Sequence, residues 1–205
     1  MKIINASHQI LGEINPDAMM KNIEFAGRVC YKSEGNITDN SAAGFIRRII
    51  QSGHESVIEH EKISVKFICD RGVTHEIVRH RIASYSQEST RYCNYAKDKF
   101  GNELTFIKPF FWEESSEEYR LWQDAMQNIE QVYNQMIAIK ATPEQARSVL
   151  PNSLKTEIIV TMNLREWRHF FKLRTSERAH PQIREISLPL LAEMKQLLPA
   201  IFGDI

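Results

Sequence analysis

The chain has 205 residues, of which 42% are hydrophobic and 25% charged, and its 26 Lys and Arg residues balance its 26 Asp and Glu residues. This composition excludes collagen-like, low-complexity and broadly disordered proteins. A formal net charge of +0 excludes a basic field over the whole protein of the kind that grips nucleic acid or membranes. A chain of this length can bury a sizeable core, so we expect one domain over residues 1–205, or two intimately joined halves.

The three cysteines Cys30, Cys69 and Cys93 are widely spaced and form no CxxC pair. This pattern argues against a disulfide scaffold or a structural zinc site, and it suits a reducing compartment. The N-terminus lacks a signal-peptide pattern, and no apolar run approaches the ~20 residues that a membrane span needs. We therefore expect a soluble cytoplasmic protein whose cysteines are buried or half-buried thiols.

Capping residues and apolar periodicity predict helices over residues 16–30, 40–51, 73–81, 115–140, 142–150, 163–173 and 182–201. Alternation of polar and apolar residues predicts strands over 62–69 and 158–162. Helices outnumber strands, and the two do not alternate regularly. The sequence therefore predicts an α+β fold in which several helices pack on a small, mainly antiparallel sheet.

Particular residues set the expected helix ends and faces. Ser115 with Glu118 forms a predicted capping box, and Asn163 is a predicted N-cap. Pro189 predicts a kink in the last helix. Arg168 and Lys172 are assigned to a solvated helix face.

Residues 79–92 form the densest polar cluster, in which Arg79-His80-Arg81 precedes a predicted loop rich in hydroxyl and amide groups. Forked arginine donors and short hydroxyls suit phosphate oxygens and the polar edges of a heterocycle. Bases at a helix C-terminus can also offset the helix dipole, at ~0.3–1 kcal/mol each. That effect explains one arginine, but not three arginines and a histidine with so little acid beside them.

The cluster resembles the signature of the flavin-dependent thymidylate synthases, which is Arg-His-Arg, seven residues, then Ser, here Ser89. Three further segments are similar to blocks of the same family and follow in its order, so the resemblance runs from about residue 50 to 185. They are the His-Glu-Ser segment 54–60, the Arg-x-x-Leu-Pro element 147–151 and the block 163–174.

The resemblance implies reductive methylation of dUMP at C5 to give dTMP. Methylenetetrahydrofolate would donate the carbon, and FAD reduced by NADPH would supply the hydride. It also implies a homotetramer with active sites shared between subunits, and no nucleic-acid or membrane partner.

The same resemblance assigns roles to individual residues. Arg174 and Ser89 are the expected catalytic positions, with the Arg174 charge beside the uracil ring. The expected cofactor-binding residues are His54, Ser56, Arg79, His80, Arg81, Gln87, Asn163, Arg165 and His169. The expected substrate-binding residues are Glu76, Arg79, Gln87, Glu88, Ser89, Thr90, Arg91, Arg147 and Arg174.

Some alternatives stay open at this point. No base-paired triad is evident beside Ser89, so a binding role is favoured over a nucleophilic one. Asn163 is also explained as a helix cap, and Arg174 as an ordinary charge at a helix C-terminus. His54 and His60 do not have the HExxH spacing, so no metal is expected. An RNA- or nucleotide-binding protein is the second interpretation, and a metal-dependent phosphohydrolase is the third.

Overall fold

The computed structural model describes residues 1–93, 95 and 103–205. Contacts between Cα atoms divide the described chain into two compact units, each assembled from separate stretches of sequence. Unit 1 comprises residues 1–7, 67–79 and 86–158, and unit 2 comprises residues 8–66, 80–85 and 159–205. No single cut in the sequence therefore separates the two.

The fold mixes helices with a small, mainly antiparallel sheet, as the sequence predicts. The sheet has the strand order β2-β3-β6-β4, with bounds β2 (Ser7–Leu11), β3 (Lys62–Asp70), β4 (Ala83–Gln87) and β6 (Lys155–Asn163). A second sheet pairs β1 (Lys2–Ile4) with β5 (Thr105–Ile107) in parallel.

Strand β3 confirms the alternating pattern, because every second residue from Ile63 to Cys69 is buried. Strand β6 is longer than the predicted segment 158–162. The prediction of an unbroken loop after Arg81 is wrong, since Ala83–Gln87 forms β4. In β4 half-buried residues alternate with exposed serines, so its polar sequence concealed a strand period.

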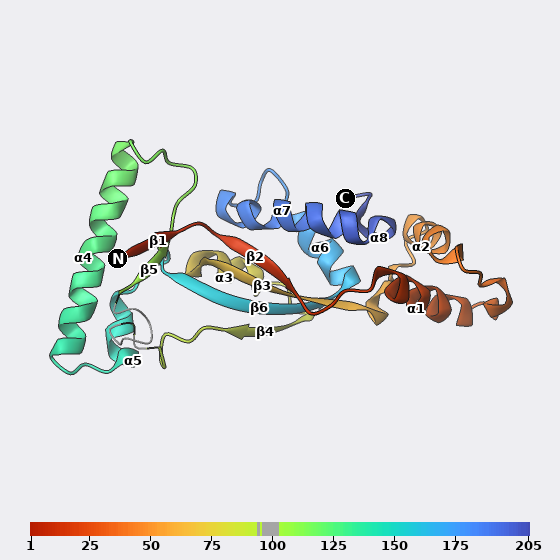
Figure 1. Ribbon diagram of the computed structural model, residues 1–205, viewed down its shortest axis with the longest axis horizontal. Coiled ribbons are helices and arrows are strands. Elements are labelled where there is room, and N and C mark those ends of the chain that lie inside the picture. The colour runs from red at the N-terminus through yellow and green to blue at the C-terminus, as the bar shows by residue number, and fades with distance from the viewer. Residues whose placement is uncertain (94, 96–102) are drawn as a thin grey trace. The chain divides into compact units, whose positions relative to one another are not determined.

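Unit 2 contains α1 (Pro16–Val29), α2 (Ser41–Gln51), α6 (Leu164–Arg174), α7 (Pro181–Leu197), α8 (Pro199–Phe202) and the 3₁₀ helices η1 (Glu34–Asn36) and η2 (Glu55–His60). Helix α1 begins where predicted, because the Asn15 side chain accepts a hydrogen bond from the Ala18 N–H at 3.0 Å. Helix α7 packs against both α6 and α8, and Figure 1 shows α6 running obliquely to α7. Their apolar faces meet in a core built around Trp167, Phe171 and Phe202.

Two expectations in unit 2 need correction. The helix predicted over residues 182–201 is two helices, α7 and α8. Helix α7 continues through Pro189 and ends at Leu197, and α8 begins at Pro199. Cys30 lies past the end of α1 and is exposed, whereas Cys69 is buried and Cys93 half-buried.

Unit 1 contains α3 (Arg71–Ile77), α4 (Glu117–Ala138), α5 (Pro143–Ala146) and η4 (Arg147–Val149). Helix α3 starts two residues earlier than predicted, because the Asp70 carboxylate accepts the Val73 N–H at 2.8 Å, and it ends earlier, at Ile77. The predicted capping box at Ser115 is wrong. Ser116 caps α4 instead, and its hydroxyl accepts the Tyr119 N–H at 3.2 Å.

The long helix α4 lies beside β1 and β5 (Figure 1), and its buried stripe forms the core of unit 1. Trp122, Met126 and Tyr133 pack in one cluster with Phe106 of β5. The apolar periodicity that predicts a helix over residues 115–140 is confirmed by these buried side chains. The indole N–H of Trp122 donates to Ser153 at 3.1 Å. Within the part of the chain that the structure describes, every helix is too short or too polar to cross a bilayer.

Candidate functional site

Strand β6 passes directly into α6 at Asn163. Helix α6 has one face in the core and one face directed outward. The Asn163 side chain accepts the Glu166 N–H at 2.8 Å, so the predicted cap is confirmed. Leu164, Trp167 and Phe171 are buried in the core. Arg165 and His169 lie four residues apart on the other face, which lines a cavity.

His80 is held between an acid and a base. The ring is 3% exposed, its Nδ1 lies 2.9 Å from a carboxylate oxygen of Glu166, and its Nε2 accepts the Nε–H of Arg174 at 3.1 Å. His80 of the predicted Arg-His-Arg motif and the late Arg174 are therefore brought together within unit 2.

These contacts fix the protonation of the ring. A guanidinium N–H can only donate, so Nε2 of His80 must carry a lone pair, and Nδ1 must carry the proton that is donated to Glu166. Burial lowers the pKa of His80 and the Arg174 charge lowers it further, while the hydrogen bond to Glu166 opposes this shift. The neutral Nδ1–H tautomer is the form that the site favours.

A cavity of about 440 Å³ adjoins this contact, and its volume lies in the range of small-molecule sites. It is lined by Glu55, Glu59, Ile82, Asn163, Arg165, Glu166, His169 and Lys172. Arg165 forms an ion pair with Glu59 at 2.6 Å, but both side chains are about half exposed, so water screens the pair and a phosphate could replace the carboxylate. Cationic and amide donors beside an aromatic imidazole suit a ligand that carries phosphate groups and a planar ring.

A second cavity of about 330 Å³ in unit 2 is lined by two further predicted cofactor residues. His54, Ser56 and Arg165 line it, together with the apolar side chains of Phe45 and Ile49. Arg165 thus borders both cavities. A mostly apolar wall with a few polar groups is typical of a site for a planar organic ligand.

In unit 1, the predicted substrate residues from Gln87 to Arg91 begin at the last residue of β4, and neighbouring side chains hold them. The Gln87 amide donates to Thr74 at 3.2 Å and to Thr156 at 3.3 Å. The Glu88 carboxylate accepts from Lys155 at 3.0 Å and from the Tyr95 hydroxyl at 2.9 Å.

The remaining groups of this segment differ in their burial. Thr90 is buried and its hydroxyl accepts from Arg147 at 3.3 Å, while half-buried Ser89 accepts the Arg91 N–H at 3.3 Å. Arg91 pairs with Glu144 at 3.0 Å, and both are more than half exposed. An exposed arginine in such a weak pair can be recruited by a ligand phosphate.

Sequence reasoning missed the ionic partners of Glu88. Burial by itself would lower the pKa of Lys155, but hydrogen bonds to Glu157 and Glu88 raise it overall. Burial and the neighbouring Glu88 raise the pKa of Tyr95. Lys155 and Glu157 are two residues apart on β6 and so lie on one face of the strand. This spacing was a signal for the pair between Lys155 and Glu157, but not for the contact with Glu88.

Other predicted site residues have surface positions. Arg79, the last residue of its stretch of unit 1, and Arg81 of unit 2 are exposed, and Glu76 is half-buried on α3. The predicted residues thus form two groups, one in each unit. Arg174, His80, His169, Asn163 and Arg165 gather in unit 2, and the segment from Gln87 to Arg91 gathers with Arg147 in unit 1.

The potential ligand atoms of His80, Glu166 and His169 lie within 4.8 Å of one another, a spacing that a metal ion could use. Both ring nitrogens of His80 are already engaged, however, and the guanidinium of Arg174 lies against one of them. A fixed positive charge at that distance opposes a divalent cation. The arrangement therefore favours an organic anion over a metal.

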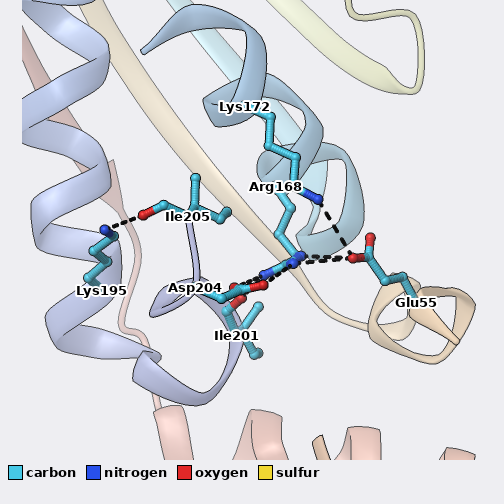
Figure 2. Close-up of polar contacts among 7 residues, drawn as sticks. All are labelled: Glu55, Arg168, Lys172, Lys195, Ile201, Asp204 and Ile205. Carbon is cyan, nitrogen blue, oxygen red and sulfur yellow. Dashed lines mark hydrogen bonds and ion pairs between the residues drawn. The ribbon is translucent and has the colours of Figure 1, made fainter. Parts of the chain in front are cut away.

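The assignment of Arg168 to a solvated face is wrong, whereas Lys172 is exposed as expected. Arg168 is 1% exposed and pairs with Asp204 at 2.6 Å and with Glu55 at 3.2 Å (Figure 2). It also donates to the backbone carbonyl of Ile201. Its position four residues after buried Leu164 was the signal that it shares the core face.

The chain is similar to known proteins in both sequence and fold. Residues 14–200 match the Thy1 family, described as thymidylate synthase complementing protein. A flavin-dependent thymidylate synthase of Pyrococcus furiosus is 40% identical over 173 residues, 84% of this chain and 70% of that protein. One of Geobacter sulfurreducens is 36% identical over 189 residues, 89% of this chain and 80% of that protein.

Among solved structures, a UMP/dUMP methylase PolB from Streptomyces cacaoi bound with 5-Br dUMP has the same fold. The TM-score is 0.78 at 22% identity, over 99% of this chain and 96% of that chain. The sequence matches and the shared fold agree with the motif resemblance. The chain belongs to the family of flavin-dependent thymidylate synthases.

Proposed function

We propose that the chain is an enzyme that methylates C5 of dUMP to give dTMP, with methylenetetrahydrofolate as carbon donor and FAD reduced by NADPH. The observation that carries this proposal is the 3.1 Å hydrogen bond from Arg174 to His80, which joins two family motifs 94 residues apart. We also propose that residues 1–205 act as one functional domain, in a cytoplasmic homotetramer with shared active sites.

Most of the proposed cofactor-binding residues belong to unit 2. Arg165 would pair with the FAD diphosphate, and Asn163 would form hydrogen bonds with polar groups of FAD. The exposed ring of His169 would lie against a planar ring of the cofactor. His54 and Ser56 would extend this site along the second cavity. Arg79, Arg81 and Gln87 complete the proposed set. When bound, the flavin supplies the redox chemistry.

The segment that follows β4 in unit 1 would hold dUMP. Arg91 and Arg147 would pair with the nucleotide phosphate, and Ser89 and Thr90 would add hydroxyl contacts. Glu76, Gln87 and Glu88 complete this proposed set. Arg174 would place a fixed positive charge at the uracil ring, where it would stabilise negative charge that develops during methylation.

Ser89 has a binding role in this proposal. Among the described residues, no histidine or carboxylate contacts its hydroxyl, whose oxygen accepts the Arg91 N–H instead. A serine without a base is a weak nucleophile.

The purified protein tests the proposal directly. A flavoprotein is yellow and absorbs in the visible, whereas a phosphohydrolase or an RNA-binding protein without a flavin is colourless. We expect dUMP to perturb the flavin spectrum, and we expect dTMP to form only when methylenetetrahydrofolate and NADPH are both supplied. A colourless protein that does not bind added FAD, or a loaded protein that makes no dTMP, would refute the function.

A further inference from the structure

Glu166 has no role in the proposed chemistry, yet it is 8% exposed and directed at the most constrained histidine of the site. A carboxylate that is buried to this degree is held there by a partner. Its partner is Nδ1 of His80 at 2.9 Å. The N-terminal capping of α6 does not need this side chain, because the cap uses the backbone N–H of Glu166 and the side chain of Asn163.

From this geometry we propose that Glu166 is a positioning residue that acts through His80 to aim the guanidinium of Arg174. The carboxylate accepts the proton of Nδ1, which leaves a lone pair on Nε2 facing the Nε–H of Arg174. The opposite tautomer would set one N–H against another, and Arg174 would lose this contact. The inference rests on the proposed function, in which Arg174 acts at the reacting base.

Packing around the ring restricts any other arrangement. The Phe170 ring lies 5.0 Å from the His80 ring between centroids, and the His169 ring lies 5.4 Å from it at an angle of 64°. The hydroxyl of Tyr85 donates to the backbone carbonyl of His80. The imidazole is thus fixed in place, so the choice of proton position decides whether Arg174 is held.

The order of the three groups also explains why a histidine joins them. A carboxylate in direct contact with Arg174 would neutralise the charge that the uracil ring needs. A neutral imidazole holds the guanidinium by a hydrogen bond and leaves its positive charge in place. The negative charge of Glu166 stays on the far side of the ring.

Two variants of Glu166 distinguish a positioning role from a general loss of structure. Glu166→Ala removes the acceptor, and Glu166→Gln keeps an amide oxygen that can accept from Nδ1. Glu177→Ala, which removes an exposed acid just beyond α6, is the matched control. For Glu166→Ala we expect kcat to fall about 10- to 100-fold, less than the ~10²–10³-fold loss for deleting a charge-stabilising donor outright. FAD affinity and the KM for dUMP should change far less than kcat, and Glu166→Gln should recover most of the rate.

A second readout does not depend on turnover. Histidine ¹⁵N NMR of the wild-type protein should show a neutral Nδ1–H ring at neutral pH, assigned to His80 by its loss in His80→Gln. Glu166→Ala should abolish that preference.

The inference is overturned if His80 is cationic or carries its proton on Nε2 in the wild type, or if Glu166→Ala turns over as fast as Glu177→Ala. Should Glu166→Ala fail to fold, the wild-type spectrum and Glu166→Gln still decide. A wild type that makes no dTMP refutes the proposed function, and the proton position on His80 is measured independently of it.

Discussion

Replacing Arg168 by methionine should destabilise the fold strongly, because this guanidinium ties the C-terminal residues to η2 (Figure 2). The variant keeps an apolar side chain in the core but removes the partners of Glu55 and Asp204 and the donor to the Ile201 carbonyl. Removing one member of a buried ion pair costs about 3–5 kcal/mol. Asp204 is 56% exposed and regains water, so we expect the lower end of that range, about 3 kcal/mol.

The assay is thermal unfolding followed by circular dichroism. For a chain of this size, about 3 kcal/mol corresponds to a fall in Tm of roughly 6–12 °C. Arg120→Met is the matched control, since Arg120 also pairs with two acids, Glu117 and Asp124, but is 57% exposed. That control should leave Tm unchanged. Equal shifts in the two variants, or none for Arg168→Met, would refute the argument from burial.

The pH dependence of the stability tests the pair between Arg168 and Asp204. The hydrogen bond from Arg168 holds the pKa of Asp204 below its ordinary value. A lowered carboxyl pKa contributes stability that is present above the unfolded pKa of about 3.9 and is lost as the pH falls through the folded pKa. Asp204→Asn should therefore be less stable than the wild type at neutral pH, and the difference should shrink below about pH 4. A constant difference across the acid range would contradict this assignment.

Three other substitutions have distinct expected outcomes. Arg174→Ala should keep FAD bound, measured by its visible absorbance, but lower dTMP formation by at least ~10²-fold because the charge at the reacting base is lost; unchanged turnover would defeat the assignment. Ser89→Ala should retain measurable activity, whereas complete loss together with an isolable covalent adduct in the wild type would restore the nucleophile. Lys155→Met should lower the free energy of unfolding by about 1.5–3 kcal/mol, since Glu88 and Glu157 lose a charged donor; an unshifted denaturation midpoint would show that the pair adds nothing.

Local chemistry made several helices predictable from sequence. Asn15 before Pro16 and Asn163 before Leu164 supply the cap that a helix start needs, and both helices begin there. The stripe of α4 was also predictable, because its apolar residues recur with the period of the helix. Helix caps and apolar periodicity depend on residues three or four positions apart, so they can be recognised without knowledge of the rest of the fold.

The four motifs were equally predictable as a set. Their residue types indicated an anionic ligand, and their order matched a family whose membership the comparisons confirm. The roles of the individual residues stay predictions, because each depends on where a ligand lies.

What only the tertiary structure decided depends on contacts between distant parts of the chain. Strand β4 was missed because its pairing, rather than its polar residues, makes it a strand. Arg168 was assigned to a solvated face, but the C-terminal residues cover it. The partner of the Glu166 carboxylate is His80, 86 residues away, which the local sequence does not indicate. A side chain's burial and partners are set by elements far away in sequence, so local pattern cannot reveal them.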